Sequence, residues 1–516
     1  MALRPLSPLW NTLTLDRCNA VSLQEQIVVY FRDAVLSGRL LCGSRVPSSR
    51  ALAAEQGIAR ITAVQAYDRL VAEGYFVPRR GSGFFIADGI PVEFLAKSPL
   101  ATGKAQSAKV PLLKPAEWTR TIPDRPHTPL ALSLGMPAVE HFPWAEWCLI
   151  TQKVYRERRQ EMLCYGDPRG ALELRTAIAR YLGTARGIAC DPSQIVIVSG
   201  SQQGIDLTAR ALVGRGERVW MEEPGYQMAR AAFQAALVET VPVPVDREGI
   251  DVAAGILLAR RARLALVSPS YQYPLGVTLS LRRRLALLEW AKSTNAWILE
   301  DDYAGEFRYS GAPLPPLYAL DRSDRVLYLG TFSKSLAPGL RQGFLVVPSD
   351  LVERFKALKL IADRQTPVLD QHVLARFISD GYLAAHLRRM RQLYSRRRTA
   401  LLEALLSEAA NVLHVNNTPE VGLHIVARTY VPVDDFVVSR SLLKRKIYAA
   451  PLSSFYAGAS HERGFALGFA GTCESQIEPA VRHLVREVES ILHQGKRTVA
   501  RKGLKRLHSQ QFVLGR

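Results

Sequence analysis

Short apolar runs recur along most of this 516-residue chain, and stretches of helical character separate them. The runs lie at residues 195–198, 218–221, 264–267, 297–299 and 326–329, with a further candidate at 344–347. Short buried strands that alternate with helices are typical of an α/β domain with a mostly parallel sheet. We therefore predict a large α/β domain over residues 128–490.

Polar residues follow several of these runs, where the strands are expected to end. Ligands of open α/β sheets bind beyond the carboxyl ends of the strands, so these residues are candidate ligand contacts. Residues 199–204 combine glycine and serine with the start of a helix, whose free N–H groups suit a phosphate. Taken alone, this segment is equally well explained as a simple turn.

Lys334 follows the run at 326–329 and is the most specific of these signals. Serines flank it, and Arg341 lies seven residues later. A lysine amine forms a Schiff base with the aldehyde of pyridoxal phosphate (PLP), and hydroxyl and guanidinium groups hold the phosphate. Asp301, after the run at 297–299, could keep the pyridine nitrogen protonated, and Tyr303 could hydrogen-bond the phenolic oxygen.

The alternatives for these residues are a solvated surface lysine and an acidic strand end or metal site. Three strand ends that suit one cofactor favour a PLP site over a lone surface lysine. The acidic segment has no histidine or further carboxylates at metal-ligand spacing, so we expect no metal.

The N-terminal region has a different pattern. Helical periodicity covers residues 23–37 and 60–73, and a helix between them opens at 47–49, with Ser48 or Ser49 as N-cap, and ends at Gly57. Residues 75–77 and 83–86 are predicted strands, joined by a turn at 78–82. Three helices and a hairpin predict a winged helix-turn-helix over residues 20–88.

The net charge of +20 and the pI near 9.9 favour a polyanionic partner, nucleic acid before a membrane surface, although a basic surface kept for solubility fits equally well. In a winged helix the third helix enters the major groove and the wing reaches backbone or minor groove. The candidate DNA-binding residues are Arg50, Arg60, Thr62, Gln65, Arg79 and Arg80.

Other segments define the organisation of the chain. Lysines, prolines and small polar residues at 89–127 predict a linker, and the basic segment 491–516 is interpreted as a solvated, disordered tail that could add phosphate contacts. The six cysteines form no Cys-x-x-Cys pair, and neither a signal peptide nor a membrane-spanning run is evident. A cytoplasmic protein is expected.

These motifs carry a family resemblance. Residues 41–53, 66–75 and 79–83 resemble the GntR-type winged helix, and residues 300–309 and 331–341 resemble fold-type I PLP enzymes of the aspartate aminotransferase superfamily. The whole arrangement resembles MocR/GabR-type regulators, in which a GntR-type winged helix precedes an aminotransferase-like domain. The resemblance also implies a smaller C-terminal α/β subdomain.

The resemblance implies a role for each matching residue. Lys334 would form the Schiff base, Asp301 would pair with the pyridine nitrogen, and Tyr303 would meet the phenolic oxygen. Tyr226 would stack on the ring, and Tyr165 would reach the phosphate of a neighbouring subunit, which implies a homodimer. The implied phosphate ligands are Ser201, Gln202, Thr331 or Ser333, and Arg341.

Two positions depart from the aminotransferase pattern. Tyr273 stands where aminotransferases carry the asparagine that supports the phenolic oxygen. Ala466 stands where catalytic members place an arginine that clamps the substrate carboxylate, and Arg463 is nearby but out of phase. Loss of the clamp weakens the case for efficient transamination.

The leading hypothesis is therefore a PLP-dependent, DNA-binding transcriptional regulator that senses PLP or an amine or amino-acid effector. The alternatives are an active aminotransferase with an appended DNA-binding module, and a DNA-binding protein whose PLP fold serves only for dimerisation.

Overall fold

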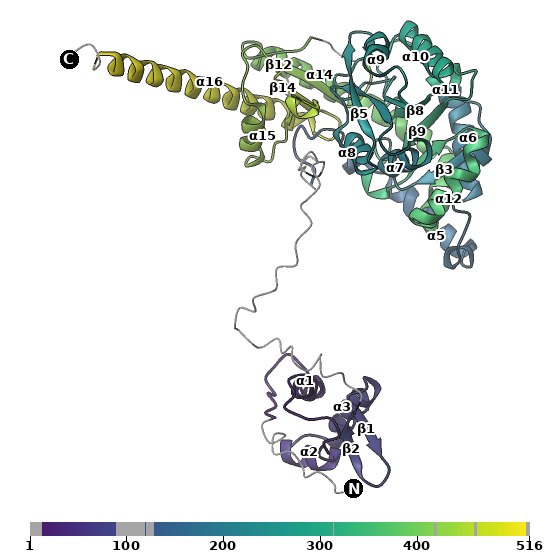
Figure 1. Cartoon of the computed structure of the whole chain (residues 1–516), viewed down its shortest axis with the longest axis vertical. Coiled ribbons are helices and arrows are strands. Elements are labelled where there is room, and N and C mark those ends of the chain that lie inside the picture. Colours follow the sequence, from purple (N-terminus) through teal and green to yellow (C-terminus); the bar gives the residue numbers. More distant parts are fainter. Residues whose placement is uncertain are drawn as a thin grey trace. The chain divides into compact units, whose positions relative to one another are not determined.

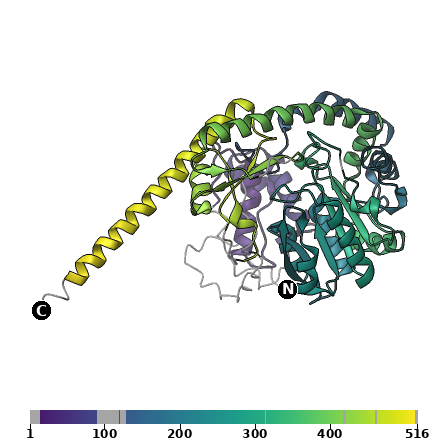
Figure 2. The ribbon, with the colours of Figure 1, turned by 90° about the horizontal axis from the view of Figure 1, so that it is seen from above.

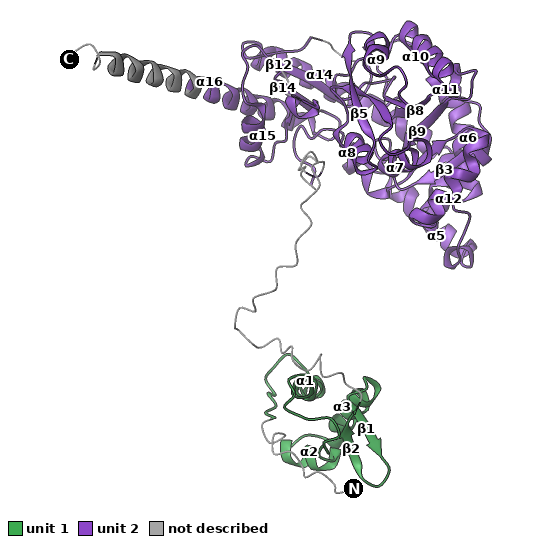
Figure 3. Ribbon diagram, viewed as in Figure 1, with its two compact units in different colours: residues 1–114 green, residues 115–516 purple. Residues whose placement is uncertain are grey.

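The computed structural model describes residues 13–88, 119, 128–312, 314–416, 420–458 and 462–511, with side chains up to residue 493. The chain divides into two compact units, residues 1–114 and 115–516 (Figure 3). The predicted linker at 89–127 lies outside the described residues, apart from Thr119.

The N-terminal unit contains three helices and a hairpin (Figure 1). Its elements are α1 (Leu23–Leu36), α2 (Ser49–Gln56), α3 (Arg60–Ala72), β1 (Phe76–Arg79) and β2 (Gly83–Ile86). The predicted capping of α2 is confirmed, because the Ser48 side chain accepts a hydrogen bond from the Ala51 N–H. One boundary was wrong: Pro78 and Arg79 belong to β1 rather than to the turn, because they pair with residues of β2.

Aromatic side chains hold these elements together. The rings of Phe31, Tyr67 and Phe76 meet edge to face, with centroids 5.1–5.9 Å apart. The Tyr67 hydroxyl also donates to the Pro47 carbonyl at 3.0 Å. This core fixes α3 against α1, the start of α2 and the hairpin, while the opposite face of α3 stays exposed.

The C-terminal unit is built on an eight-stranded sheet of order β3-β10-β9-β8-β7-β4-β5-β6. The strands are β3 (Ile195–Val198), β4 (Arg218–Glu223), β5 (Glu239–Asp246), β6 (Gly249–Ile250), β7 (Leu264–Val267), β8 (Trp297–Asp302), β9 (Val326–Thr331) and β10 (Gly343–Val346). Neighbours from β9 to β5 are parallel, whereas β10 is antiparallel to both of its neighbours. The prediction of a mostly parallel sheet is confirmed.

All six apolar runs form strands, but β5 was missed. Its alternating valines and prolines, with Pro242 and Pro244 inside the strand, do not have the composition of a buried strand. β8 is longer than predicted, so Glu300, Asp301 and Asp302 lie inside the strand rather than after it.

Helices cover both faces of the sheet (Figures 1 and 2). They are α5 (Trp144–Glu157), α6 (Leu172–Arg186), α7 (Ser201–Leu212), α8 (Gln227–Ala235), α9 (Val252–Ala259), α10 (Leu281–Thr294), α11 (Leu317–Leu320), α12 (Val352–Ala362) and α13 (Val368–Ser379). Alternate residues of β3 serve different cores: Val196 and Val198 pack with α7 and α12, and Ile195 and Ile197 pack with α6 and α13. Burial on both faces explains why the strands are continuous apolar runs.

A second, four-stranded antiparallel sheet of order β11-β12-β14-β13 forms the smaller C-terminal subdomain. Its elements are β11 (Leu413–His414), β12 (His424–Thr429), β13 (Ala450–Pro451) and β14 (Gly464–Gly468), with α14 (Tyr382–Glu408), α15 (Asp435–Leu443) and α16 (Glu474–Gln511). The predicted subdomain is confirmed.

The expectation of a disordered tail was wrong for residues 491–511, because α16 continues to Gln511. That segment is rich in leucine, lysine and arginine, which are good helix formers. Residues 512–516 lie outside the described part. Within the described part, no helix has both the length and the apolar character needed to span a membrane.

Candidate functional site

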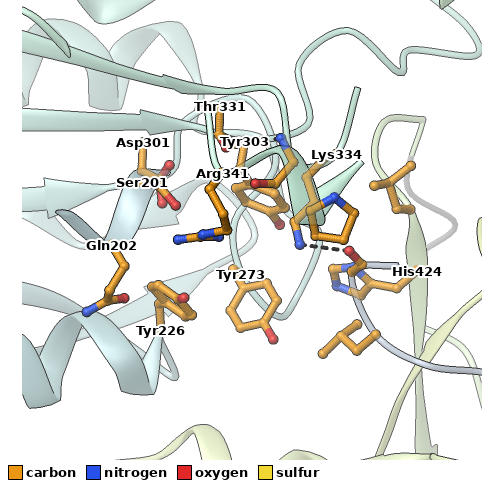
Figure 4. A pocket seen from close by; sticks show the side chains of 15 residues that line it. Ser201, Gln202, Tyr226, Tyr273, Asp301, Tyr303, Thr331, Lys334, Arg341 and His424 are labelled. Carbon is orange, nitrogen blue, oxygen red and sulfur yellow. Dashed lines mark hydrogen bonds between the residues drawn. The ribbon is translucent and has the colours of Figure 1, made fainter. Parts of the chain in front are cut away.

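A pocket lies where β8 and β9 end and α7 begins (Figure 4). Nine of the ten predicted cofactor residues line it, namely Lys334, Asp301, Tyr303, Ser201, Gln202, Tyr226, Thr331, Ser333 and Arg341. The fold thus gathers side chains that are up to 140 positions apart (201 to 341) into one site. The remaining lining residues are Leu134, Gly135, Tyr273, Pro338, Leu423 and His424.

Three consecutive buried carboxylates end β8, and two of them bond to other groups of the protein. Glu300 accepts hydrogen bonds from the backbone N–H groups of Leu317, at 3.0 Å, and of Tyr318, at 2.9 Å. Asp302 forms a buried ion pair with Arg186 and accepts a hydrogen bond from the Tyr328 hydroxyl at 2.7 Å. These partners explain how a strand can bury adjacent acids at its end.

Asp301 points into the pocket, since side chains alternate along a strand. Its Oδ1 atom is buried and, within the described residues, has no hydrogen-bond partner, and the same holds for the Tyr303 hydroxyl. Burial, together with the charge of Asp302, raises the pKa of Asp301 to about 7, although Lys334 acts in the opposite direction. An acceptor and a phenol left unpartnered side by side fit a ligand ring with a protonated nitrogen and an oxygen, as in PLP.

Lys334 lies in the loop after β9, and its Nζ donates to the Gly135 carbonyl at 2.7 Å (Figure 4). Gly135 has φ +71°, and a Cβ there would lie 3.0 Å from the Lys334 Nζ. The backbone conformation therefore favours a glycine, and a Cβ at this position would force the Lys334 amine to shift. Sequence reasoning missed Gly135, because an isolated glycine nearly two hundred positions away carries no local signal.

The opposite end of the pocket suits an anion. Ser201 opens α7, a helix of 12 residues, and Gly200, with φ +83°, is its N-cap. The Arg341 Nη2 donates to the Ser199 carbonyl at 2.7 Å, and a Cβ on Gly200 would lie 2.8 Å from the same nitrogen. A glycine, a helix N-terminus and a guanidinium at one place have the chemistry of a phosphate cradle.

Aromatic rings form another wall. Tyr273 meets Tyr226 and Tyr303 edge to face, with centroids 5.6 and 5.9 Å apart. Tyr273, at the sequence position of the aminotransferase asparagine, thus lines the pocket. His424, from β12, was missed; its Nε2 lies 2.7 Å from the Pro274 carbonyl, and burial lowers its pKa to about 4. The imidazole is therefore neutral and donates to that carbonyl.

Tyr165 does not line this pocket. It is 76% exposed, and the Arg364 guanidinium lies 3.7 Å from its ring centroid. Arg463 also lies elsewhere, beside Asp434 and Asp435. In the part of the chain that the structure describes, Arg341 is thus the one arginine that lines the pocket.

The predicted DNA-binding residues lie on the surface of the N-terminal unit. Arg50, Arg60, Gln65 and Arg80 are exposed, and Thr62 is half-buried on α3. The Arg79 guanidinium stacks 4.5 Å from the Phe85 ring centroid and lies 3.4 Å from the Asp88 carboxylate. The wing thus carries a positioned arginine in β1 and a second one at its tip.

One group outside the pocket has metal-ligand chemistry. Glu161, Glu173 and His372 bring ligand atoms within 4.8 Å of one another. Arg158 forms ion pairs with both glutamates, at 2.7 and 3.0 Å. The protein itself therefore balances the negative charge that would attract a metal ion. We assign no metal to this group.

Comparison with known families matches both units. Residues 23–86 match the bacterial regulatory proteins of the gntR family, and residues 131–484 match aminotransferase class I and II. The chain therefore belongs to the MocR type of regulators, in which a gntR-family winged helix precedes a fold-type I aminotransferase domain.

Curated relatives share this organisation over nearly their whole length. The probable rhizopine catabolism regulatory protein MocR of Rhizobium meliloti is 36% identical over 92% of this chain and 95% of its own. The pyridoxine biosynthesis transcriptional regulator PdxR of Corynebacterium glutamicum is 31% identical over 94% of this chain and 99% of its own. Among solved structures, Pyrococcus horikoshii kynurenine aminotransferase in complex with PMP is 31% identical, with a TM-score of 0.65 over 70% of this chain and 91% of its own.

The buried Asp301 gives a testable pH dependence. A carboxyl whose pKa rises from 3.8 to about 7 on folding contributes stability at low pH that is lost as pH rises through 7. Between pH 5 and pH 8, the free energy of unfolding of cofactor-free Asp301→Asn should therefore rise relative to wild type by roughly 1–4 kcal/mol. Urea unfolding followed by tryptophan fluorescence measures this difference. Asp350→Asn, at an exposed carboxylate, is the control and should show no such rise. The same pH dependence for Asp301→Asn as for wild type would contradict the buried, unpaired carboxylate.

Proposed function

We propose that this protein is a DNA-binding transcriptional regulator that holds PLP at Lys334 and responds to PLP itself or to an amine or amino acid. One observation carries the proposal: a chain with a gntR-family winged helix keeps Lys334, Asp301, Tyr303 and Arg341 around a single pocket. A domain kept only as a scaffold would have no need of an amine, an unpartnered carboxylate and an anion cradle at one place.

The pocket residues divide into four roles. PLP bound there would supply an aldehyde that reacts with primary amines. Lys334 would hold the aldehyde carbon, Asp301 would hold the proton on the ring nitrogen, and Tyr303 would donate to the ring oxygen. Tyr226 would cover the ring face, and Arg341 and Ser201 would bind the phosphate, with Gln202, Thr331 and Ser333 at the same pocket surface.

The N-terminal unit would read double-stranded DNA through α3 and the wing. Arg60 and Gln65 project from the exposed face of α3, with Arg50 on α2 and Thr62 half-buried beside them. Gln65 has the side-chain chemistry for base-edge contacts, whereas the arginines suit phosphates or guanines. Domain limits of 20–88 for this reader and 128–490 for the PLP-binding domain are part of the proposal.

A homodimer in the cytoplasm is the form we propose for the active protein. Large apolar side chains are exposed on α5 and on the segment that leads to α6: Trp144, Leu149, Tyr155, Leu163 and Tyr165 are 52–88% exposed. Exposed apolar groups at this density favour burial against a second copy. The dimer would bring Tyr165 to the phosphate of the neighbouring subunit.

Aminotransferase activity is the second candidate function, and the retained pocket favours it. Transamination requires an incoming amino donor and a 2-oxo acid to turn over repeatedly at Lys334. Ala466, at the position of the carboxylate clamp, is fully buried and offers no charge to such substrates. The regulator is therefore the better-supported function, and sustained product formation from an amino donor and a 2-oxo acid would favour the enzyme.

Lys334→Ala tests the PLP-dependent part of the proposal. The variant should lose the visible absorption of protein-bound PLP and the effect of PLP or effector on DNA binding, because the covalent anchor is gone. Its affinity for DNA in the absence of PLP should stay within about twofold of wild type, because the winged helix lies in a separate unit. Absorption spectra and fluorescence anisotropy with duplex DNA measure the two properties. Lys356→Ala, at a half-buried lysine of α12 outside the pocket, is the control. A Lys334→Ala protein that still responds normally would refute PLP sensing at this site.

Arg80→Ala tests the DNA reader. Removal of one phosphate-contacting charge should lower the slope of log affinity against log salt concentration by about 1, with little dependence on DNA sequence. Anisotropy titrations between low and moderate salt measure this slope. Arg247→Ala removes the same charge from an exposed position in the C-terminal unit and should leave the slope unchanged. Equal slopes for wild type and Arg80→Ala would exclude a wing contact at this position.

A further inference from the structure

Nearly all of the charged side chains that line the pocket already have a partner or a role in PLP binding before an effector enters. Its basic side chains, within the described residues, are Lys334, Arg341 and His424. Lys334 is the residue that would react with PLP, and Arg341 lies at the phosphate cradle, where it also donates to the Ser199 carbonyl. His424 is neutral, because burial lowers its pKa and its Nε2 donates to the Pro274 carbonyl.

Two acidic groups lie at or near the pocket. Asp301 lines it, and Glu222 is buried close enough to Asp301 for the two charges to interact. Burial raises the pKa of Glu222 to about 8, against the hydrogen bonds that it receives from Ser268 and Gln272. Asp301 would pair with the ring nitrogen and Glu222 is mostly protonated near neutral pH, so neither group offers a positive partner to a ligand that carries its own carboxylate.

The wall beside the aromatic rings is apolar. Ala466, in β14, packs in one buried cluster with Leu134 and Tyr273, which line the pocket, and with Val426 and Phe455 behind them. Ala466 pairs with Val426 of β12 and Ala450 of β13 in the sheet. The side chains that this face of the small sheet presents towards the pocket thus carry no charge. Figure 4 shows the rings of Tyr226 and Tyr273 next to each other at the pocket.

From this charge balance we infer that the effector is a primary amine without a carboxylate, with an aromatic or aliphatic body that packs against Tyr226, Tyr273 and Leu134. The inference rests on the proposed function, because the amine must reach PLP at Lys334. A buried carboxylate would lose its hydration without gaining a cation, whereas an amine with an uncharged body buries apolar surface against the rings and the leucine. The pocket thereby excludes ordinary α-amino acids and ω-amino acids alike.

The test compares amines with their carboxylated counterparts on the PLP-loaded, full-length protein. The pairs are phenethylamine with phenylalanine, tyramine with tyrosine, and pentylamine with 5-aminopentanoate. Titration of the visible absorption of bound PLP gives a half-saturating concentration for each compound. We expect the amine of each pair to shift the spectrum at a concentration at least tenfold lower than its carboxylated partner.

The outcomes separate the inference from the function on which it rests. Equal or better binding of the carboxylated partners overturns the inference and leaves PLP binding intact. A PLP band that no amine or amino acid shifts also overturns it, and then PLP itself is the signal. If no band forms when PLP is added, the proposed function fails, and the inference fails with it.

Ala466→Arg tests the origin of the discrimination. A guanidinium on this face should improve the binding of the carboxylated compounds. The ratio of half-saturating concentrations between each carboxylated compound and its amine should therefore fall at least tenfold. Ala466→Leu is the matched control for added bulk without charge and should retain the preference. Circular dichroism confirms that each variant is folded. A folded Ala466→Arg protein with the wild-type preference would overturn the assignment of selectivity to this wall.

Discussion

The end of β8 is the constraint on which the site depends, because three adjacent carboxylates are buried there. Two of them have protein partners: Glu300 is bonded by the backbone at the start of α11, and Asp302 by Arg186 and Tyr328. Within the described residues the Oδ1 atoms of Asp301 and Asp302 both lack a hydrogen-bond partner, but of the two only Asp301 lines the pocket. Burial of a carboxylate without a partner is costly, and a cationic ring nitrogen would remove that cost. The end of β8 therefore favours the binding of a ligand with a cationic group beside Asp301.

Much of the fold could be predicted because strands that are buried on both faces of the sheet appear in the sequence as continuous apolar runs. The runs that became β3, β7 and β9 are short, apolar and bounded by polar residues, so their periodicity was sufficient. β5 could not be predicted in the same way, since Pro242 and Pro244 hide its pattern. The helical extension of α16 was missed because high charge was taken as a sign of disorder, whereas lysine and arginine are also good helix formers.

The site residues also fall into two groups, those that a local sequence pattern predicts and those that only the folded structure reveals. Lys334 and the start of α7 follow strands, and Asp301 lies at the end of one. Their chemistry is rare in combination, so the sequence alone indicated them. His424 and Gly135 come from the small subdomain and from a loop before α5, and only tertiary contacts bring them to the pocket. Their roles are also ones that composition does not reveal: a neutral imidazole bonded to a carbonyl, and a missing Cβ beside the Lys334 amine.

Coupling between the two units requires a difference in binding, not merely the presence of both on one chain. An effector can shift DNA affinity only to the extent that it binds one arrangement of the protein more tightly than another. A coupling free energy of about 1–3 kcal/mol, typical of allosteric proteins, would change DNA affinity by roughly 5- to 150-fold. Exchange of the Lys334 bond for a bond to an effector amine would release the Lys334 amine and let it donate to the Gly135 carbonyl. This change at Lys334 is the local event that we expect to shift the protein between arrangements with different DNA affinity.

The covalent position of PLP tests the account most directly. Incubation of the full-length protein with PLP, reduction with borohydride and peptide mapping by mass spectrometry would locate the phosphopyridoxyl group. The account predicts modification of Lys334 at about one group per chain, with far less label in Asp301→Asn, whose carboxylate no longer holds the ring nitrogen. Label spread over exposed lysines, or none at Lys334, would contradict a functional PLP site in this regulator.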